Sequence, residues 1–302
     1  MQDIIIIGAG PCGLSAGIYA VRGGYKTTII EKDFIGGQAS LTYEIENYPG
    51  FPKIGGMELA SKMADHAMGF GAEIKYGEIS QMDLQGDTKS VVVDGETLKA
   101  KAVILATGAK PRKLGIEKED MLTGRGVSYC ATCDGGFYRG KTACVIGGGN
   151  TAVEDALYLA GIADKVYIIH RRGEFRASKV LQDRLFENEK ITFVEKSVVK
   201  EIVGETAVEG VIVENLETKE ITQIKTDGIF VAIGNIPTTA DLQIEKDESG
   251  YIITNEKLET SVAGVFAGGD ARKTPLRQVV TAAADGAIAG TSAIEYLMKL
   301  SR

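Results

Sequence analysis

An apolar segment followed by a glycine-rich turn begins the sequence and most constrains its fold. Residues 4–7 are four consecutive isoleucines, and Gly8, Gly10 and Gly13 follow with the spacing G-x-G-x-x-G. β-Branched residues favour strands, and this glycine spacing joins a strand to a helix in dinucleotide-binding βαβ units. The glycines allow a tight turn, the close approach of a pyrophosphate, and packing of the helix on the strand. The segment therefore predicts a dinucleotide-binding unit.

The same pattern occurs a second time in the chain. Residues 143–146 form another apolar segment, and a turn with Gly147 and Gly149 follows it. In the first unit the next predicted strand ends at Glu31, 23 residues after the first glycine, and His170 stands 23 residues after Gly147. Equal spacing indicates an internal repeat of two βαβ units in register.

The residue that ends the second strand differs between the two repeats. A carboxylate such as Glu31 accepts hydrogen bonds from a ribose diol and disfavours a 2′-phosphate, so the first site suits FAD or NAD. The second repeat has His170, followed by Arg171, Arg172 and Arg176. Guanidinium groups bind phosphate through charge-assisted, bidentate hydrogen bonds, so the expected ligand is NADPH. The alternative is that these arginines form an ordinary solvated cluster.

Three further apolar segments predict strands that complete the two units: residues 102–108, 228–234 and 264–270. If the third belonged to the second repeat, the first would lack its closing region, so we expect the second unit to be inserted into the first. The predicted fold is α/β with two Rossmann-like, three-layer nucleotide-binding domains. The FAD-binding domain is discontinuous and spans 1–112 and 244–302, and the NADPH-binding domain with the cysteine pair spans 113–243. The two neighbouring crossings between them can act as a hinge.

The segment after residue 264 has features that suit a flavin. Asp270 follows two glycines at the end of an apolar strand, where its carboxylate can reach a ribityl chain. A long C-terminal helix is predicted to begin near Pro275, because proline fits the first helical position. Its first turn would hold Arg277, Gln278 and Val279, and its N-terminus would stabilise negative charge on a reduced isoalloxazine. An ordinary buried helix is the alternative.

Composition narrows the class of protein. The 302 residues favour two domains, and 38 glycines against 6 prolines favour several loops that approach a ligand closely. A net charge of −7 gives no overall attraction for nucleic acid or an anionic membrane. No apolar stretch approaches the about 18 residues that span a bilayer, and no signal peptide is recognisable. Four cysteines are too few for a disulfide scaffold, so we expect a cytoplasmic protein.

Two of the four cysteines form a C-x-x-C motif. Cys130 and Cys133 are separated by two residues, and Cys133 lies 14 residues upstream of Gly147. Two thiols at this spacing can close a disulfide and lower one another's pKa, which suits thiol–disulfide exchange. The adjacent Asp134 can hold or deliver the proton that a departing thiolate needs. A turn or helix-cap role for Asp134 stays open.

A zinc site and a pair of idle core cysteines are the alternatives for this motif. Zinc needs two further ligands, but Cys12 lies in a glycine loop, Cys144 lies in a predicted buried strand, and the only histidines are His66 and His170. We therefore expect no metal. Free cysteine often behaves as a small hydrophobic residue, so the idle pair is not excluded by spacing alone.

Taken together, the motifs closely resemble those of the low-molecular-weight, bacterial-type thioredoxin reductases, over essentially the whole chain. The resemblance rests on Gly8-Ala9-Gly10-Pro11, Gly36-Gly37-Gln38, Glu46-Asn47-Tyr48-Pro49-Gly50, Ala106-Thr107-Gly108-Ala109, Cys130-Ala131-Thr132-Cys133-Asp134, the Gly147 turn, His170-Arg171-Arg172, Arg176-Ala177, and Gly268-Gly269-Asp270 followed by Arg277-Gln278. The cysteine motif directly upstream of an NADPH turn distinguishes this family from the larger disulfide reductases.

The resemblance implies a homodimer with one FAD in each subunit. NADPH would reduce FAD by hydride transfer, FAD would reduce the Cys130–Cys133 disulfide, and the dithiol would reduce thioredoxin. Cys133 would face the flavin, Cys130 would attack thioredoxin, and Asp134 would act as acid and base. Family members rotate the NADPH domain between the half-reactions, because the disulfide and the nicotinamide need the same face of the flavin.

The resemblance also assigns the cofactor residues. Those for FAD are Gly8, Gly10, Pro11, Gly13, Glu31, Gly37, Gln38, Asn47, Thr107, Gly108, Asp270, Arg277, Gln278 and Val279; those for NADPH are Gly147, Gly149, Asn150, Thr151, His170, Arg171, Arg172 and Arg176. The chain departs from the family pattern at Tyr48, Gly136 and Asn235, of which Gly136 bears on partner preference. A dithiol oxidase, a reductase with another electron donor, and a non-catalytic flavoprotein are the competing hypotheses.

Overall fold

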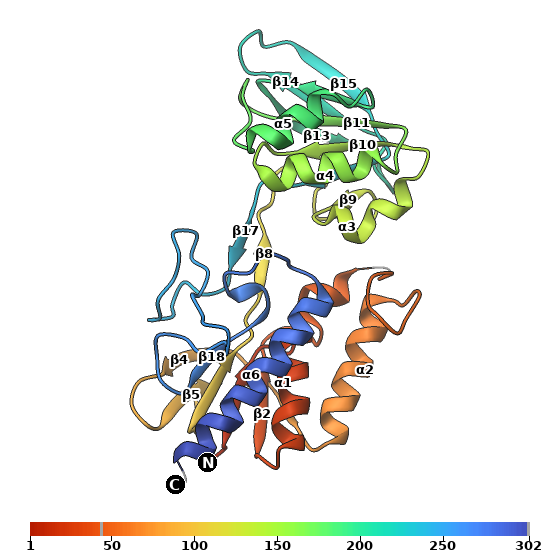
Figure 1. Ribbon diagram of the computed structural model, residues 1–302. Coiled ribbons are helices and arrows are strands. Elements are labelled where there is room, and N and C mark those ends of the chain that lie inside the picture. The colour runs from red at the N-terminus through yellow and green to blue at the C-terminus, as the bar shows by residue number, and fades with distance from the viewer. Residues whose placement is uncertain (43–44, 301–302) are drawn as a thin grey trace. The chain divides into compact units, whose positions relative to one another are not determined.

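The computed structural model describes residues 1–42 and 45–300. The chain divides into two compact units, which we call the outer unit (Met1–Lys110 with Ile236–Arg302) and the inserted unit (Pro111–Asn235). The ribbon in Figure 1 identifies the elements of each unit. No helix in the described ranges has both the length and the apolarity that a membrane span requires.

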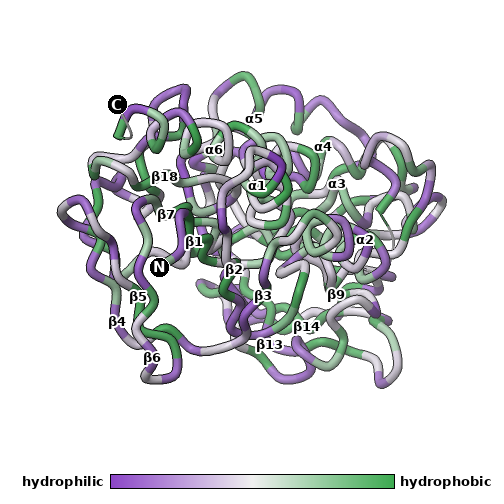
Figure 2. Tube along the Cα trace, turned by 90° about the horizontal axis from the view of Figure 1, so that it is seen from below, coloured by the Kyte–Doolittle hydropathy of each residue, from purple (hydrophilic) through white to green (hydrophobic). Residues whose placement is uncertain are grey.

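A five-stranded parallel sheet forms the centre of the outer unit, in the order β18-β7-β1-β2-β3. Its strands are β1 (Ile4–Ile7), β2 (Thr27–Glu31), β3 (Glu73–Tyr76), β7 (Ala102–Leu105) and β18 (Val265–Ala267). The isoleucines of β1 are at most 6% exposed, and Figure 2 shows this strand in the green of apolar residues. A run of β-branched side chains therefore became a central strand buried on both faces.

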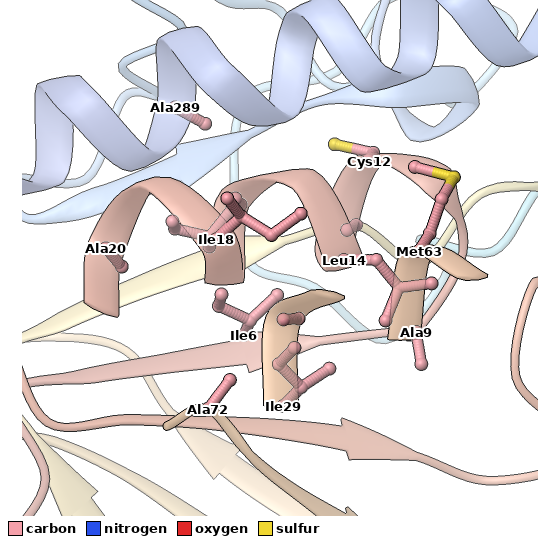
Figure 3. Close-up of a cluster of buried hydrophobic side chains, with 14 of the residues drawn as sticks. Ile6, Ala9, Cys12, Leu14, Ile18, Ala20, Ile29, Met63, Ala72 and Ala289 are labelled. Atoms are coloured by element: carbon pink, nitrogen blue, oxygen red, sulfur yellow. The ribbon is translucent and has the colours of Figure 1, made fainter. Parts of the chain in front are cut away.

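The two faces of β1 contact different layers. Ile4 and Ile6 pack in a cluster with residues of three helices: α1 (Pro11–Arg22), α2 (Gly56–Gly69) and α6 (Val279–Leu300). In Figure 3, Ala289 of α6 points towards α1, with Ile6 on the other side of α1. Ile5 and Ile7 pack against an antiparallel sheet of β4 (Ile79–Asp83), β5 (Lys89–Val93) and β6 (Glu96–Ala100). The outer unit therefore has three layers.

The inserted unit repeats the central sheet, in the order β12-β11-β10-β16-β9. Its elements are β9 (Val127–Ser128), α3 (Ala131–Asp134), β10 (Thr142–Ile146), α4 (Asn150–Ala160), β11 (Lys165–Ile169), α5 (Lys179–Phe186), β12 (Ile191–Val194) and β16 (Gly228–Val231), with an antiparallel sheet of β13 (Ser197–Val203), β14 (Gly210–Asn215) and β15 (Ile221–Lys225).

The strand register matches between the units. Ile4 pairs with Thr27 and Thr142 pairs with Lys165, so the partners are 23 positions apart in both sheets. The parallel α/β fold with two Rossmann-like sheets is therefore confirmed.

The chain passes between the units on two short strands that pair with each other, β8 (Ala109–Pro111) and β17 (Asn235–Pro237). The segment after β17 makes its contacts in the outer unit: the Thr238 N–H donates to the Gly108 carbonyl oxygen (3.0 Å), and Leu242 packs in the cluster of Ile5. The second boundary of the compact units thus falls at 235/236, eight residues before the expected 243/244.

The expected start of the C-terminal helix near Pro275 is wrong, because α6 begins at Val279. The Thr281 hydroxyl accepts the Gln278 N–H (3.1 Å), and the Gln278 carbonyl accepts the Ala282 N–H (2.9 Å). Gln278 therefore caps the helix, as the reciprocal bond of a capping box does. Arg277 and Gln278 lie before the helix and not in its first turn.

Candidate functional site

The first glycine turn has one position packed against the sheet, one packed against its own loop, and one open position. A Cβ on Gly8 (φ +104°) would lie 2.4 Å from the Ala106 carbonyl oxygen, and one on Gly13 would lie 1.8 Å from the Gly8 oxygen. No described atom lies within 4 Å of a Cβ placed on Gly10, the residue that precedes α1. The turn thus leaves open space beside Gly10 at the N-terminus of α1, and helix N-termini of this kind bind pyrophosphate.

Glu31 is held at the end of β2 by backbone N–H groups. The Ala9 N–H donates to Glu31 Oε2 (2.7 Å) and the Asp33 N–H donates to Oε1 (2.9 Å). Each carboxylate oxygen retains acceptor capacity, because it has two lone pairs. The carboxylate is therefore oriented beside the glycine turn, as a ribose-binding acid requires.

Two pairs of predicted FAD residues that are distant in sequence lie together. Gly37 lies beside Gly10, since its Cβ would be 3.7 Å from the Gly10 Cα atom. The Asn47 Nδ2 donates to Gln278 Oε1 (2.9 Å) across 231 residues. The remaining positions lie at element ends: Pro11 begins α1, Gln38 is exposed in the 3-10 helix Gly37–Leu41, Gly108 (φ +67°) follows β7, and Val279 begins α6.

Asp270 lies in a single 3-10 turn (Gly269–Ala271) directly after β18. Burial raises the pKa of its carboxyl group, and the positive charge of Arg277 opposes that rise. The Arg277 guanidinium lies over the Tyr251 ring, 4.3 Å from its centroid. Tyr251 was not predicted from the sequence, because nothing local marks a residue 26 positions away as a partner of Arg277.

Two orphaned polar atoms test whether these residues fit FAD. Thr107 Oγ1 and Arg277 Nε are buried and have no hydrogen-bond partner among the described residues. Native proteins rarely leave such atoms unpaired, so a polar ligand that reaches them is expected. Together with the space at Gly10, these atoms fit a bound dinucleotide.

The second glycine turn has the same geometry. A Cβ on Gly147 would lie 2.4 Å from the Ala232 carbonyl oxygen, whereas no described atom lies within 4 Å of one on Gly149. The turn is tied to residues further along the chain, because the Asn150 Oδ1 accepts the Ser178 N–H (2.9 Å). Thr151 is exposed in the first turn of α4, where N–H groups are free for an anion.

His170 is buried rather than presented at the surface. The residue is 6% exposed, its ring lies parallel to Phe175 (5.9 Å between centroids), and a Cβ on Gly148 would meet the ring at 2.4 Å. Burial and the nearby arginines lower its pKa, so the ring is neutral at pH 7. Its Nε2 atom has no hydrogen-bond partner in the described chain.

The three arginines after β11 are exposed, in contrast to His170. Within the described residues, Arg171, Arg172 and Arg176 have no ion-pair partner. The Arg176 N–H donates to the Gly148 carbonyl oxygen (2.7 Å), which holds this segment at the glycine turn. Unpaired guanidinium groups beside an open glycine turn fit a nucleotide with a 2′-phosphate.

The cysteine pair forms a disulfide at the start of α3. Cys130 and Cys133 have their Cα atoms 5.3 Å apart, and both residues are half-buried. Cys12 and Cys144 are buried free thiols, and burial raises the pKa of each. A reactive disulfide needs partial exposure, so Cys130 and Cys133 suit thiol–disulfide exchange, whereas the buried Cys12 and Cys144 do not.

Ser128 connects the disulfide to Asp134. Its hydroxyl donates to Asp134 Oδ2 (2.6 Å) and accepts the Cys130 N–H (3.1 Å). Burial raises the pKa of Asp134, and the Ser128 hydrogen bond opposes the rise. Asp134 is therefore more readily protonated than an exposed aspartate. Ser128 was missed by sequence reasoning, since a serine six residues upstream carries no spacing signal.

Comparison with known proteins decides the family. Residues 2–286 match the pyridine nucleotide-disulphide oxidoreductases. The chain is 47% identical over 304 residues to the thioredoxin reductase of Bacillus subtilis (strain 168), covering 99% of this chain and 96% of that protein. The chain belongs to the thioredoxin reductases.

Solved structures of similar chains support this membership. Thioredoxin reductase from Streptococcus pyogenes MGAS5005 is 46% identical with a TM-score of 0.92, and the match covers 99% of both chains. A ferredoxin-flavin thioredoxin reductase from Clostridium acetobutylicum is 31% identical with a TM-score of 0.53, covering 99% of this chain and 98% of that one. Membership of the family assigns FAD and NADPH as the cofactors.

Proposed function

We propose that this chain is an NADPH-dependent thioredoxin-disulfide reductase. The observation that carries the proposal is the half-buried Cys130–Cys133 disulfide in the same unit as a glycine turn with three unpaired arginines. A dithiol, a pyridine-nucleotide site and a second dinucleotide turn are the parts that such a reductase needs.

The outer unit is proposed to hold FAD and the inserted unit NADPH. Gly10 leaves space for the pyrophosphate of FAD, and Glu31 accepts its ribose hydroxyls. Gly149 leaves space for the pyrophosphate of NADPH, and Arg171, Arg172 and Arg176 bind its 2′-phosphate. When bound, FAD accepts a hydride from NADPH and supplies two electrons to the disulfide.

The protein's own thiols are proposed to carry out the exchange with thioredoxin. Breaking the Cys130–Cys133 bond takes two electrons and two protons and yields two thiols. Cys130 loses its proton, attacks the thioredoxin disulfide as the thiolate and forms a mixed disulfide, which releases one thioredoxin sulfur. Cys133 then loses its proton and attacks Cys130 Sγ, so that the Cys130–Cys133 disulfide forms again, the second thioredoxin sulfur is released, and the two protons end on the thioredoxin thiols. Asp134, held by Ser128 and with its pKa raised by burial, is placed to take up a proton and deliver it to a leaving thiolate.

Rotation of the inserted unit between half-reactions belongs to the same proposal. The disulfide and the NADPH turn both lie in the inserted unit, and each has to approach the flavin in the outer unit. The paired strands β8 and β17 are the two crossings, and a pair of short neighbouring crossings suits a hinge.

We also propose a cytoplasmic homodimer, for which the exposed Tyr19, Met57 and Phe70 of the outer unit supply apolar surface.

Reduction of thioredoxin by NADPH with the purified protein tests the proposal. We expect turnover in the wild type, and a loss of at least about 1,000-fold in Cys133→Ser, because one thiol cannot close the disulfide again. NADPH should still bleach the flavin of that variant. Retained thioredoxin reduction in Cys133→Ser would contradict the dithiol route. Turnover with reduced ferredoxin but not with NADPH would contradict NADPH as the electron donor.

Cys144→Ala provides the matched control for this experiment. Its thiol is also in the inserted unit, but burial raises its pKa to about 12, so it stays protonated and unreactive. We expect thioredoxin reduction within about twofold of wild type, since the change removes one sulfur atom from the core.

A further inference from the structure

A buried carboxylate interrupts the apolar helix α6. Asp285 is 7% exposed and accepts three hydrogen bonds: from the Gly269 N–H (2.9 Å), from Arg272 Nε (2.7 Å) and from Arg272 Nη2 (2.8 Å). The two bonds from Arg272 are bidentate, the geometry that combines strength with fixed orientation. The Asp285–Arg272 ion pair therefore holds both side chains in one fixed orientation within an otherwise apolar contact.

The partners of Asp285 flank Asp270 on both sides. Gly269 precedes Asp270, and Arg272 follows it by two residues, so the pair spans the 3-10 turn that carries Asp270. The guanidinium is also fixed at its far end, because Nη1 donates to the Lys273 carbonyl oxygen (3.0 Å). Each end of the turn is thus bound to α6.

Helix α1 holds the same turn from another side. A Cβ on Gly268 would lie 2.6 Å from Cys12 Sγ and 3.2 Å from the Cβ of Asp285, so the backbone of the turn is packed between the two helices. Gly269 adopts φ +66°, a backbone conformation that residues other than glycine rarely take. These contacts hold the backbone of the turn closely against α1 and α6.

Asp270 itself makes no hydrogen bond to the described chain through its carboxylate. The backbone around Asp270 is held by contacts with α1 and α6, whereas its carboxylate is available to a ligand. We propose that the Asp285–Arg272 pair is a positioning element that fixes the turn so that the Asp270 carboxylate meets the ribityl hydroxyls of FAD. This inference rests on the proposed function of the outer unit as the FAD-binding unit.

Stability alone does not account for such a pair. Desolvation offsets most of the attraction in a buried ion pair, and apolar replacements of similar volume are often neutral for stability. A positioning role instead predicts that FAD affinity depends on the pair, even in variants that fold. The two roles are separable by measurement.

The test is titration of FAD-free protein with FAD, followed by flavin fluorescence, at a temperature where each variant is folded. We expect Asp285→Asn to raise the dissociation constant of FAD about 10- to 100-fold, because charge-assisted bonds of this strength are lost. Arg272→Lys keeps the charge but loses the fork, and should lie between Asp285→Asn and wild type. Glu295→Gln, which breaks the half-exposed Lys257–Glu295 pair of the same helix, should stay within about twofold.

Three results would overturn the inference. The first is FAD affinity of folded Asp285→Asn within twofold of wild type, and the second, if that variant does not fold, is wild-type affinity in Arg272→Lys. The third is an equal loss of affinity in Glu295→Gln, since the effect would then belong to any charge on α6. Failure of the wild type itself to bind FAD would contradict the proposed function instead.

Discussion

The two glycine turns share their backbone and differ in the residues that come after the second strand. A Cβ added to Gly8 or to Gly147 would lie 2.4 Å from a carbonyl oxygen at the end of a neighbouring strand, whereas Gly10 and Gly149 are both open. The outer unit then has a carboxylate fixed by N–H groups, whereas the inserted unit has a buried neutral histidine. The turn therefore supplies a general pyrophosphate cradle, and the residues after the second strand select the nucleotide.

The arginines should account for most of that selection. We expect the triple variant Arg171→Ala, Arg172→Ala, Arg176→Ala to lower the ratio of kcat/KM for NADPH to that for NADH by about 100- to 1,000-fold, since charge-assisted hydrogen bonds contribute about 1.5–3 kcal/mol each and are not additive. The rise should be in KM for NADPH. Arg184→Ala, an exposed arginine on α5, is the control and should leave the ratio unchanged.

Substitution of an open glycine should separate binding from folding. Gly149 is the N-cap of α4 with φ −94° and free space, so Gly149→Ala should lower the free energy of unfolding by no more than about 1 kcal/mol while raising KM for NADPH about 10-fold or more. Gly147→Ala should instead lower the free energy of unfolding by about 1–3 kcal/mol, because φ is +155° and a carbonyl oxygen blocks the Cβ. Urea unfolding and steady-state kinetics measure the pair; the reverse ranking would refute the cradle geometry.

His170 should give the stability of the inserted unit a small pH dependence. Its pKa is lowered in the folded protein, first by burial and then by the arginines, below the 6.5 of an unfolded histidine. The unfolded chain therefore binds the proton more readily, and the free energy of unfolding falls as the pH drops through 6.5 towards the folded pKa. Relative to His170→Gln, wild type should lose stability from pH 7 to pH 5; parallel curves would contradict the assignment.

Much of this comparison was predictable from the sequence, because its signals are local. The isoleucine run, the glycine spacing and the 23-residue distance to Glu31 or His170 each lie within one βαβ unit. The features that sequence reasoning missed depend on contacts between distant segments, such as Tyr251 with Arg277. The start of α6 was misplaced for a related reason: proline marks a favourable first position, but the Thr281 hydroxyl sets the cap at Gln278.

Buried polar side chains were the least predictable feature. Ser128 at Asp134 and Asp285 at Arg272 look like ordinary polar residues in the sequence, and only the fold shows that each is enclosed with its partner. His170 was predicted at the NADPH site, yet its burial against Gly148 was not, because a residue's depth depends on packing that spacing does not encode.

Anaerobic titration of the FAD-loaded wild type with NADPH and with NADH shows whether the two similar turns hold different nucleotides. Bleaching of the flavin absorbance reports the half-saturating concentration of each nucleotide. We expect it to be about 100-fold lower for NADPH, because only NADPH has the 2′-phosphate for Arg171, Arg172 and Arg176 to bind. Equal half-saturating concentrations would contradict the assignment of the inserted unit.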